Sequence, residues 1–181
     1  INFETKNETY YNVFTTNGTP EFTELITTNH RFTFLSKAKE SNQILFRRMN
    51  FTDYPELESA SIDFATPKKL TTVNPQQEEY NWGTVEMVEW TSFEGRELRG
   101  LLYKPEDFDS TKSYPMIAYF YENYTQTIHT HYTPKPTASI VYPTEYVSNG
   151  YIIFIPDIEY TAGHPAQSAY DCIVSGTDYL S

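Results

Sequence analysis

The stretch YPMIAYFYENY, residues 114–124, decides how the rest of the chain is interpreted. Its first part is apolar enough to lie inside a β-sheet, whereas it ends on Tyr121, Glu122 and Asn123. A second apolar run, YIIFIPDI at 151–158, has the length and composition of a strand covered on both faces. Neighbouring parallel strands present their carboxyl ends at one sheet edge, where α/β proteins bind ligands. The sequence therefore predicts a parallel pair that delivers polar side chains to such an edge.

The segments around this pair predict the start of a doubly wound α/β domain. VEMVEWTS and ELRGLLYKP flank FEGR, a turn in which Gly95 is expected at positive φ, and together they indicate a hairpin. A short helix is predicted over 144–149, ended by Gly150. A longer helix is predicted after His164, with Pro165 in its first turn. Its apolar stripe at helical spacing comprises Ala166, Ala169, Ile173, Val174, Thr177 and Leu180.

The region upstream follows a different pattern. Residues 10–64 contain short runs of alternating apolar and polar residues, separated by turn-prone pieces such as NGTP and KESN. Short strands at this spacing favour antiparallel sheet, as in a sandwich, a barrel or a propeller blade. A polar, proline-containing stretch at 67–83 follows and is typical of a boundary. We therefore predict two domains, 1–83 and 84–181.

Composition excludes several classes of function. The 181 residues carry 13 Lys and Arg against 24 Asp and Glu, a net charge of −11, which argues against nucleic acid as a partner. No apolar run is long enough to cross a bilayer, so no membrane span is expected. The single cysteine, Cys172, excludes an internal disulfide. The compartment stays open, although abundant Asn, Thr and Tyr lean towards a periplasmic or extracellular location.

Four segments in order resemble the prolyl oligopeptidase family of serine peptidases, including its dipeptidyl-peptidase and acylaminoacyl-peptidase types. TDYPELESASIDFATPKKLTTVNPQ at 52–76 resembles the closing strands of that family's β-propeller. Residues 89–122 resemble the entry into its α/β-hydrolase domain, and 145–163 and 168–180 resemble the strand and helices that follow. The resemblance, which covers about 50–181, implies a mixed fold class: C-terminal β-propeller strands followed by the truncated N-terminal part of an α/β-hydrolase fold.

The resemblance also implies a reaction and a site. Members of the family hydrolyse peptide substrates through an acyl-enzyme, without a metal or an organic cofactor, and a tyrosine after the third strand contributes its hydroxyl to the oxyanion hole. That tyrosine falls on Tyr121, with Glu122 and Asn123 as candidate substrate-binding residues. The family usually has glycines and a proline after this tyrosine, where the present chain has Glu122-Asn123-Tyr124. An inactive pseudo-peptidase is therefore one alternative.

The nucleophile motif of such enzymes is missing from the sequence. No G-x-S-x-G occurs, and Ser175-Gly176 lacks a glycine two residues before the serine. The family's order implies a fragment that ends before the nucleophile elbow and is inactive, because the serine, aspartate and histidine of the triad lie downstream. The strand at 115–121 would then have an open apolar edge, and we expect a homo-oligomer to form through it.

Other candidate sites have simpler explanations. His129 and His131 would hold a metal only with an added carboxylate, such as Glu122 or Asp157, so no metal site is predicted. Asp157 and Asp171 are interpreted as structural carboxylates that hold loops or cap a helix. Aromatic residues such as Trp82 and Trp90 suit a second alternative, a non-catalytic β-rich module that binds carbohydrate or protein.

Overall fold

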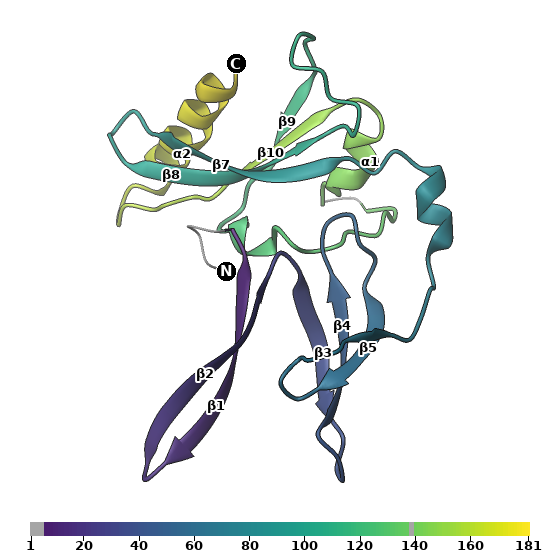
Figure 1. Cartoon of the computed structure of the whole chain (residues 1–181). Coiled ribbons are helices and arrows are strands. Elements are labelled where there is room, and N and C mark those ends of the chain that lie inside the picture. The colour runs from purple at the N-terminus through teal and green to yellow at the C-terminus, as the bar shows by residue number, and fades with distance from the viewer. Residues whose placement is uncertain (1–5, 138–139) are drawn as a thin grey trace. The chain divides into compact units, whose positions relative to one another are not determined.

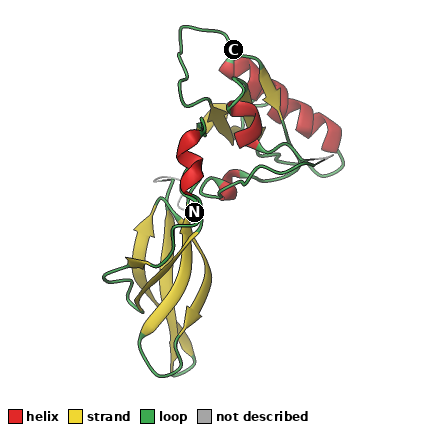
Figure 2. Cartoon of the chain, turned by 90° about the vertical axis from the view of Figure 1, so that its right-hand side faces the viewer, coloured by secondary structure: helices red, strands yellow, loops and turns green. Residues whose placement is uncertain are grey.

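The computed structural model describes residues 6–137 and 140–181, so residues 1–5 of the first predicted domain lie outside the described residues. The chain divides into two compact units. Unit 1 is Ile1–Pro75 with His129–His131, and unit 2 is Gln76–Ile128 with Tyr132–Ser181. The described residues are mostly β-sheet with few helices; unit 1 contains two sheets and unit 2 contains one (Figures 1 and 2). The assignment of 1–83 and 84–181 to separate domains stays a prediction.

Unit 1 begins with an antiparallel hairpin of β1 (Glu8–Thr16) and β2 (Thr19–Thr28). The two-residue connection is Asn17-Gly18, with φ of 52° at Asn17 and 80° at Gly18. Asparagine and glycine tolerate this left-handed backbone better than other residues, and two positive φ values match the twist of a tight hairpin. The NGTP signal in the sequence therefore marks a real turn.

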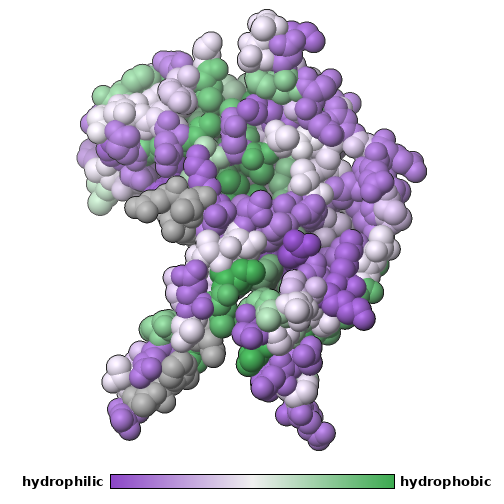
Figure 3. All heavy atoms as spheres, in the orientation of Figure 1, coloured by the Kyte–Doolittle hydropathy of each residue, from purple (hydrophilic) through white to green (hydrophobic). Residues whose placement is uncertain are grey.

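The second sheet of unit 1 has the strand order β3-β4-β5-β6, and all its pairs are antiparallel. Its strands are β3 (Arg31–Lys37), β4 (Gln43–Met49), β5 (Glu56–Ser61) and β6 (Lys68–Lys69). Alternate residues of β4 and β5 are buried, so that Ile44, Phe46 and Ala60 share one core with Phe64. Hydrophilic residues cover the tip of the β3–β4 hairpin (Figure 3). The antiparallel strands predicted within 10–64 are confirmed.

The sheet of unit 2 has the order β7-β8-β10-β9. Its strands are β7 (Thr84–Thr91), β8 (Glu97–Lys104), β9 (Met116–Ala118) and β10 (Ile152–Pro156). β7 and β8 form the predicted hairpin, with Gly95 at φ 79° in its turn. β10 pairs antiparallel with β8 and parallel with β9, in the register Ile153↔Ile117. The parallel pair predicted from the sequence is confirmed.

β9 is shorter than the strand predicted over 115–121. The Tyr119 N–H still donates to the carbonyl oxygen of Phe154 at 2.9 Å, but the chain then turns away from β10. Phe120 and Tyr121 lie beyond the ladder and are 47% and 69% exposed. The apolar stretch of the sequence is longer than the strand because its last two aromatic residues belong to the loop that follows β9.

The helices of the described residues are short except for the last. They are η1 (Pro75–Glu79), η2 (Thr125–Thr127), α1 (Pro143–Val147) and α2 (Pro165–Leu180). Pro165 opens α2 as predicted, since its missing N–H costs nothing at a first turn. The apolar stripe predicted for α2 is confirmed in part: Ala169, Ile173 and Leu180 are partly buried and pack against the core of the sheet, whereas Ala166 is exposed.

α2 also buries a face of small and polar residues, namely Ser168, Asp171, Cys172, Ser175 and Gly176. A Cβ at Gly176 would lie 2.6 Å from Cζ of Phe154 and 2.9 Å from Cζ2 of Trp90, so glycine lets the helix approach the sheet closely. Trp90 and Phe154 pack edge to face, with ring centroids 5.4 Å apart, in a core shared with Leu98. The close approach at Gly176 therefore adds a steric requirement to the apolar packing of α2 against this core.

Candidate functional site

The loop that follows β9 carries all three predicted site residues. Tyr121, Glu122 and Asn123 are consecutive and exposed, at the carboxyl end of β9. Ligands of α/β sheets are bound at this end of the strands. The phenol of Tyr121 is not packed in a dry core, which would have been incompatible with a role at a site. The roles of these three residues stay predictions.

The backbone of this loop is held by the segment that leaves β10. The Ile158 N–H donates to the carbonyl oxygen of Glu122 at 3.1 Å, and the Tyr160 hydroxyl donates to the carbonyl oxygen of Tyr121 at 3.3 Å. With the last ladder bond from Tyr119, these contacts hold the loop backbone on both sides of the Tyr121 side chain. The phenol is therefore exposed on a backbone that is itself well bonded.

Asp157 makes the densest set of contacts to the loop. Its Oδ1 accepts from the Tyr124 N–H at 2.6 Å and from the Thr125 N–H at 3.0 Å, and its Oδ2 accepts from the Thr125 hydroxyl at 2.5 Å. Asp157 and Thr125 are buried, with 6% and 1% of their surface exposed. Hydrogen bonds to an ionised acceptor are the stronger class, so this carboxylate is well suited to hold the loop. The interpretation of Asp157 as a loop-holding residue is confirmed.

Tyr124 lies next to the exposed part of the loop and packs edge to face on Tyr119, with centroids 5.8 Å apart. Burial, together with a side-chain hydrogen bond with Tyr119, raises the pKa of Tyr124 to about 12. Its phenol is therefore protonated at neutral pH. Nothing in the sequence distinguished Tyr124 from the other tyrosines, because its environment arises only from the folded loop.

The two loop histidines lie in unit 1 and not with the predicted site. Nε2 of His129 is 2.9 Å from the carbonyl oxygen of Lys6, and burial lowers the pKa of this imidazole. His131 packs edge to face on Tyr54, and burial lowers its pKa as well. Across residues 6–137 and 140–181, no group of three or more histidine, cysteine or carboxylate side chains is arranged to hold a metal ion.

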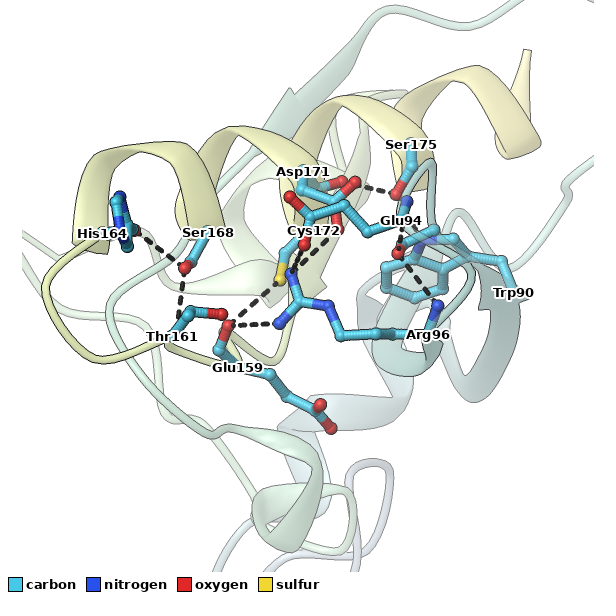
Figure 4. A network of polar contacts seen from close by, with 11 residues as sticks. Trp90, Glu94, Arg96, Glu159, Thr161, His164, Ser168, Asp171, Cys172 and Ser175 are labelled. Carbon is cyan, nitrogen blue, oxygen red and sulfur yellow. Dashed lines mark hydrogen bonds and ion pairs between the residues drawn. The ribbon is translucent and has the colours of Figure 1, made fainter.

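A second polar network joins α2 to the β7–β8 turn (Figure 4). Nη2 of Arg96 donates to Oδ2 of Asp171 at 2.9 Å, and Nη1 donates to the carbonyl oxygen of Glu159 at 3.0 Å. Burial alone would raise the pKa of Asp171, but hydrogen bonds from Ser92 and Arg96 outweigh it and lower this pKa below its ordinary value. Asp171 is therefore ionised and holds the turn, as its interpretation as a structural carboxylate predicted.

Arg96 was missed in the sequence as a partner of Asp171, because 75 residues separate the two. The same is true of Trp90, whose Nε1–H donates to Oγ of Ser175 at 2.9 Å inside the core. The only signal in the sequence for these contacts was the run of polar residues at helical spacing in α2, which indicates a helix face with polar partners but does not identify them. Through Glu159, this network supports the segment that holds the Tyr121 loop.

No protein-family model matches the chain, and no curated protein matches it in sequence. No described helix is both long enough and apolar enough to span a bilayer. Solved structures, in contrast, share its fold. A post-proline cleaving enzyme from Rickettsia typhi matches with a TM-score of 0.64 and 15% identity, over 98% of this chain and 26% of that chain.

Two further solved structures give the same result. An acylaminoacyl peptidase from Pyrococcus horikoshii has a TM-score of 0.55 and 15% identity, over 96% of this chain and 31% of that chain. A putative dipeptidyl aminopeptidase IV from Bacteroides ovatus has a TM-score of 0.55 and 17% identity, over 91% and 25%. The chain thus spans about a quarter to a third of the length of these three structures. It has a fold found in part of the prolyl oligopeptidase-family peptidases.

Proposed function

We propose that these 181 residues form part of a serine peptidase of the prolyl oligopeptidase type. In this proposal β1–β6 are strands from the end of a β-propeller, and β7–β10 with α1 and α2 begin an α/β-hydrolase domain. The likeness to three peptidases over more than nine tenths of the chain supports the fold part of the proposal. The strand order β7-β8-β10-β9, with its single parallel pair, supports the hydrolase part.

The observation that carries the functional part is the position of Tyr121. A parallel strand pair delivers it to the carboxyl end of β9, where the residue is 69% exposed and its backbone carbonyl accepts from the Tyr160 hydroxyl. We assign its hydroxyl to the oxyanion hole, where it donates to the charge that develops on the scissile carbonyl oxygen. A donor fixed in advance loses little free energy to reorganisation at the moment of reaction.

Glu122 and Asn123 complete the proposed site as substrate-binding residues. Both are exposed next to Tyr121 and offer a carboxylate and an amide to a bound peptide. In this proposal the serine, aspartate and histidine of the triad come from residues outside these 181. The absence of G-x-S-x-G supports this for the serine, and the order of the family that the sequence resembles supports it for the other two. The 181-residue chain alone is therefore expected to be inactive, and neither a metal nor an organic cofactor is required.

The test uses the longest natural polypeptide that contains these residues, a serine-directed fluorophosphonate probe, and chromogenic peptides that end in proline or alanine. We expect covalent labelling and peptide cleavage. Tyr121→Phe should lower kcat by about 10²–10³-fold with little change in KM, since the hydroxyl acts on the developing oxyanion. Tyr151→Phe, which alters another exposed tyrosine, is the matched control and should retain full activity.

Absence of both labelling and cleavage would contradict the peptidase proposal and favour a binding module or an inactive pseudo-peptidase. If Tyr121→Phe cleaves peptides as fast as the unaltered protein, the peptidase proposal stands, but the proposed role of the Tyr121 hydroxyl in the oxyanion hole is wrong. Glu122→Gln and Asn123→Ala should change KM more than kcat if these side chains bind substrate.

A further inference from the structure

We propose that Asp157 is the positioning residue for Tyr121, holding the tyrosine's loop in place from the segment that directly follows β10. The value of this placement for catalysis rests on the proposed function, but the placement itself does not. Three donors from two consecutive residues, Tyr124 and Thr125, converge on this one buried carboxylate.

The first step is the geometry of the start of η2. The free N–H groups at a helix start usually bond to a side chain of the residue that caps it. Tyr124 caps η2 and provides no such bond. Asp157 supplies the missing acceptor from a position 33 residues away along the chain. The conformation of this turn therefore depends on where β10 places Asp157, and not on local sequence.

The second step is the connection to Tyr121. Tyr121 and Tyr124 are three residues apart, and the intervening Glu122 carbonyl is bonded to Ile158, the residue after Asp157. The Asp157 N–H itself donates to the carbonyl oxygen of Arg99 in β8, at 2.9 Å, so the carboxylate is carried by backbone that is tied to the sheet. Loss of the carboxylate would release one end of the Tyr121 segment while the β9 end stays bonded.

The third step separates positioning from general stability. Asp157→Asn retains an oxygen that can accept from both backbone N–H groups, whereas Asp157→Ala removes every acceptor. Asparagine should therefore rescue the loop and alanine should not. A role in overall stability alone would lower the melting temperature of the protein without a specific change at Tyr121.

The experiment uses the 181-residue chain, with 3-fluorotyrosine at position 121 as a ¹⁹F NMR probe and amide hydrogen exchange at Tyr124 and Thr125. In Asp157→Ala we expect at least about tenfold faster exchange at both amides, together with a shifted or broadened ¹⁹F signal. Asp157→Asn should stay close to the unaltered protein in both measurements. An unchanged ¹⁹F signal and unchanged exchange in Asp157→Ala would overturn the proposal.

Asp109→Ala is the matched control, because Oδ1 of Asp109 likewise accepts from a backbone N–H and a hydroxyl, both of Thr111. It should leave Tyr121 unaffected, and a ¹⁹F change equal to that of Asp157→Ala would overturn the proposal. Should Asp157→Ala not fold, Thr125→Val decides the question. This variant removes only the hydroxyl donor, so a smaller ¹⁹F shift is expected, and no shift would count against the proposal.

Failure of the proposed function is distinguishable from failure of this inference. Full peptidase activity in Tyr121→Phe would remove the catalytic role while the exchange and ¹⁹F results stood. Conversely, an activity loss in Tyr121→Phe with an unaltered loop in Asp157→Ala would support the peptidase and refute the positioning role.

Discussion

Nη2 of Arg96 lies 2.9 Å from Oδ2 of Asp171, and this ion pair joins the turn of the β7–β8 hairpin to α2. Asp171 is 1% exposed, whereas the Arg96 side chain is 25% exposed. Without that carboxylate, Arg96 would keep Glu94 and the Glu159 carbonyl oxygen as partners. Loss of the buried Asp171 carboxylate nevertheless removes the contact that ties the hairpin turn to the helix, and breaking a buried ion pair is destabilising. The position of α2 on the sheet therefore depends on this contact.

Asp171→Asn is expected to lower the free energy of unfolding by about 3 kcal/mol at pH 7. The pKa of Asp171 is lowered in the folded protein, so its contribution is fully present above its unfolded value of about 3.9 and is lost as the pH falls through the folded pKa. Urea denaturation at pH 7, 5 and 3 should show the difference from the unaltered protein shrinking only at the lowest pH. Asp178→Asn, an exposed position of α2, is the control and should cost less than about 0.5 kcal/mol.

Gly176→Ala is expected to destabilise the protein by about 1–3 kcal/mol, although alanine is the better helix former. The added methyl carbon would lie 2.6 Å from Cζ of Phe154. The nearest atoms belong to the rigid rings of Phe154 and Trp90, which cannot bend away as the end of a flexible side chain could. Thermal unfolding checks this result. The double variant Gly176→Ala/Phe154→Leu should recover part of the loss relative to Phe154→Leu alone, and strict additivity of the two changes would contradict the proposed clash.

Ser175→Ala should cost about 1–2 kcal/mol, because the buried Trp90 Nε1–H loses its acceptor. The tryptophan emission spectrum should change with it, while Ser148→Ala, an exposed hydroxyl that donates only to Glu145, should leave both stability and emission unaffected. Equal effects of the two serine substitutions would show that the Trp90 contact contributes nothing.

The outer edge of β9 is the proposed site of homo-oligomer formation. Among the described residues, β9 is the last strand of its sheet and pairs only with β10. Pro115 and Tyr119 bond to β10, so the alternation of a strand directs the backbone of Ala118 outward. Unpaired strand edges recruit other chains, and we expect concentration-dependent association of the 181-residue chain in sedimentation velocity.

Ala118→Pro removes an outward N–H without touching the bonds to β10, so it should shift the chain towards monomer. Glu40→Pro, in the exposed turn between β3 and β4, is the comparison and should not alter association. A monomer at every concentration, before any substitution, would contradict the expected oligomer.

The strands were predictable where the burial of each strand leaves a pattern in its own sequence, whether one face or both faces are buried. Ile44 and Phe46 alternate with exposed or partly exposed residues, so a period of two identifies β4 without tertiary information. Ile153, Phe154 and Ile155 are all buried, and their continuous apolar run identified a central strand. These patterns depend on burial of each strand by itself.

The remaining features depend on pairs of residues that only the fold brings together. The close approach of α2 to the sheet depends on the flat rings of Trp90 and Phe154, which leave room for Gly176 but not for a larger residue. The loop turn at Tyr124 is capped from Asp157, far along the chain. β9 ends where the chain turns away from β10 after Tyr119, although β10 itself continues to Pro156, and the apolar run at 115–121 does not reveal this turn.

The composition of the buried face of α2 has a consequence for how the protein opens. This face combines directional bonds, from Trp90 to Ser175 and from Arg96 to Asp171, with apolar packing of the helix against the core of the sheet. The ion pair is lost when Asp171 is protonated, and because the pKa of this carboxyl is lowered in the folded protein, protonation requires a pH below the ordinary range of aspartate. Strong acid is therefore expected to loosen α2 in a subglobal opening, uncovering the indole of Trp90 while the β-strands remain paired.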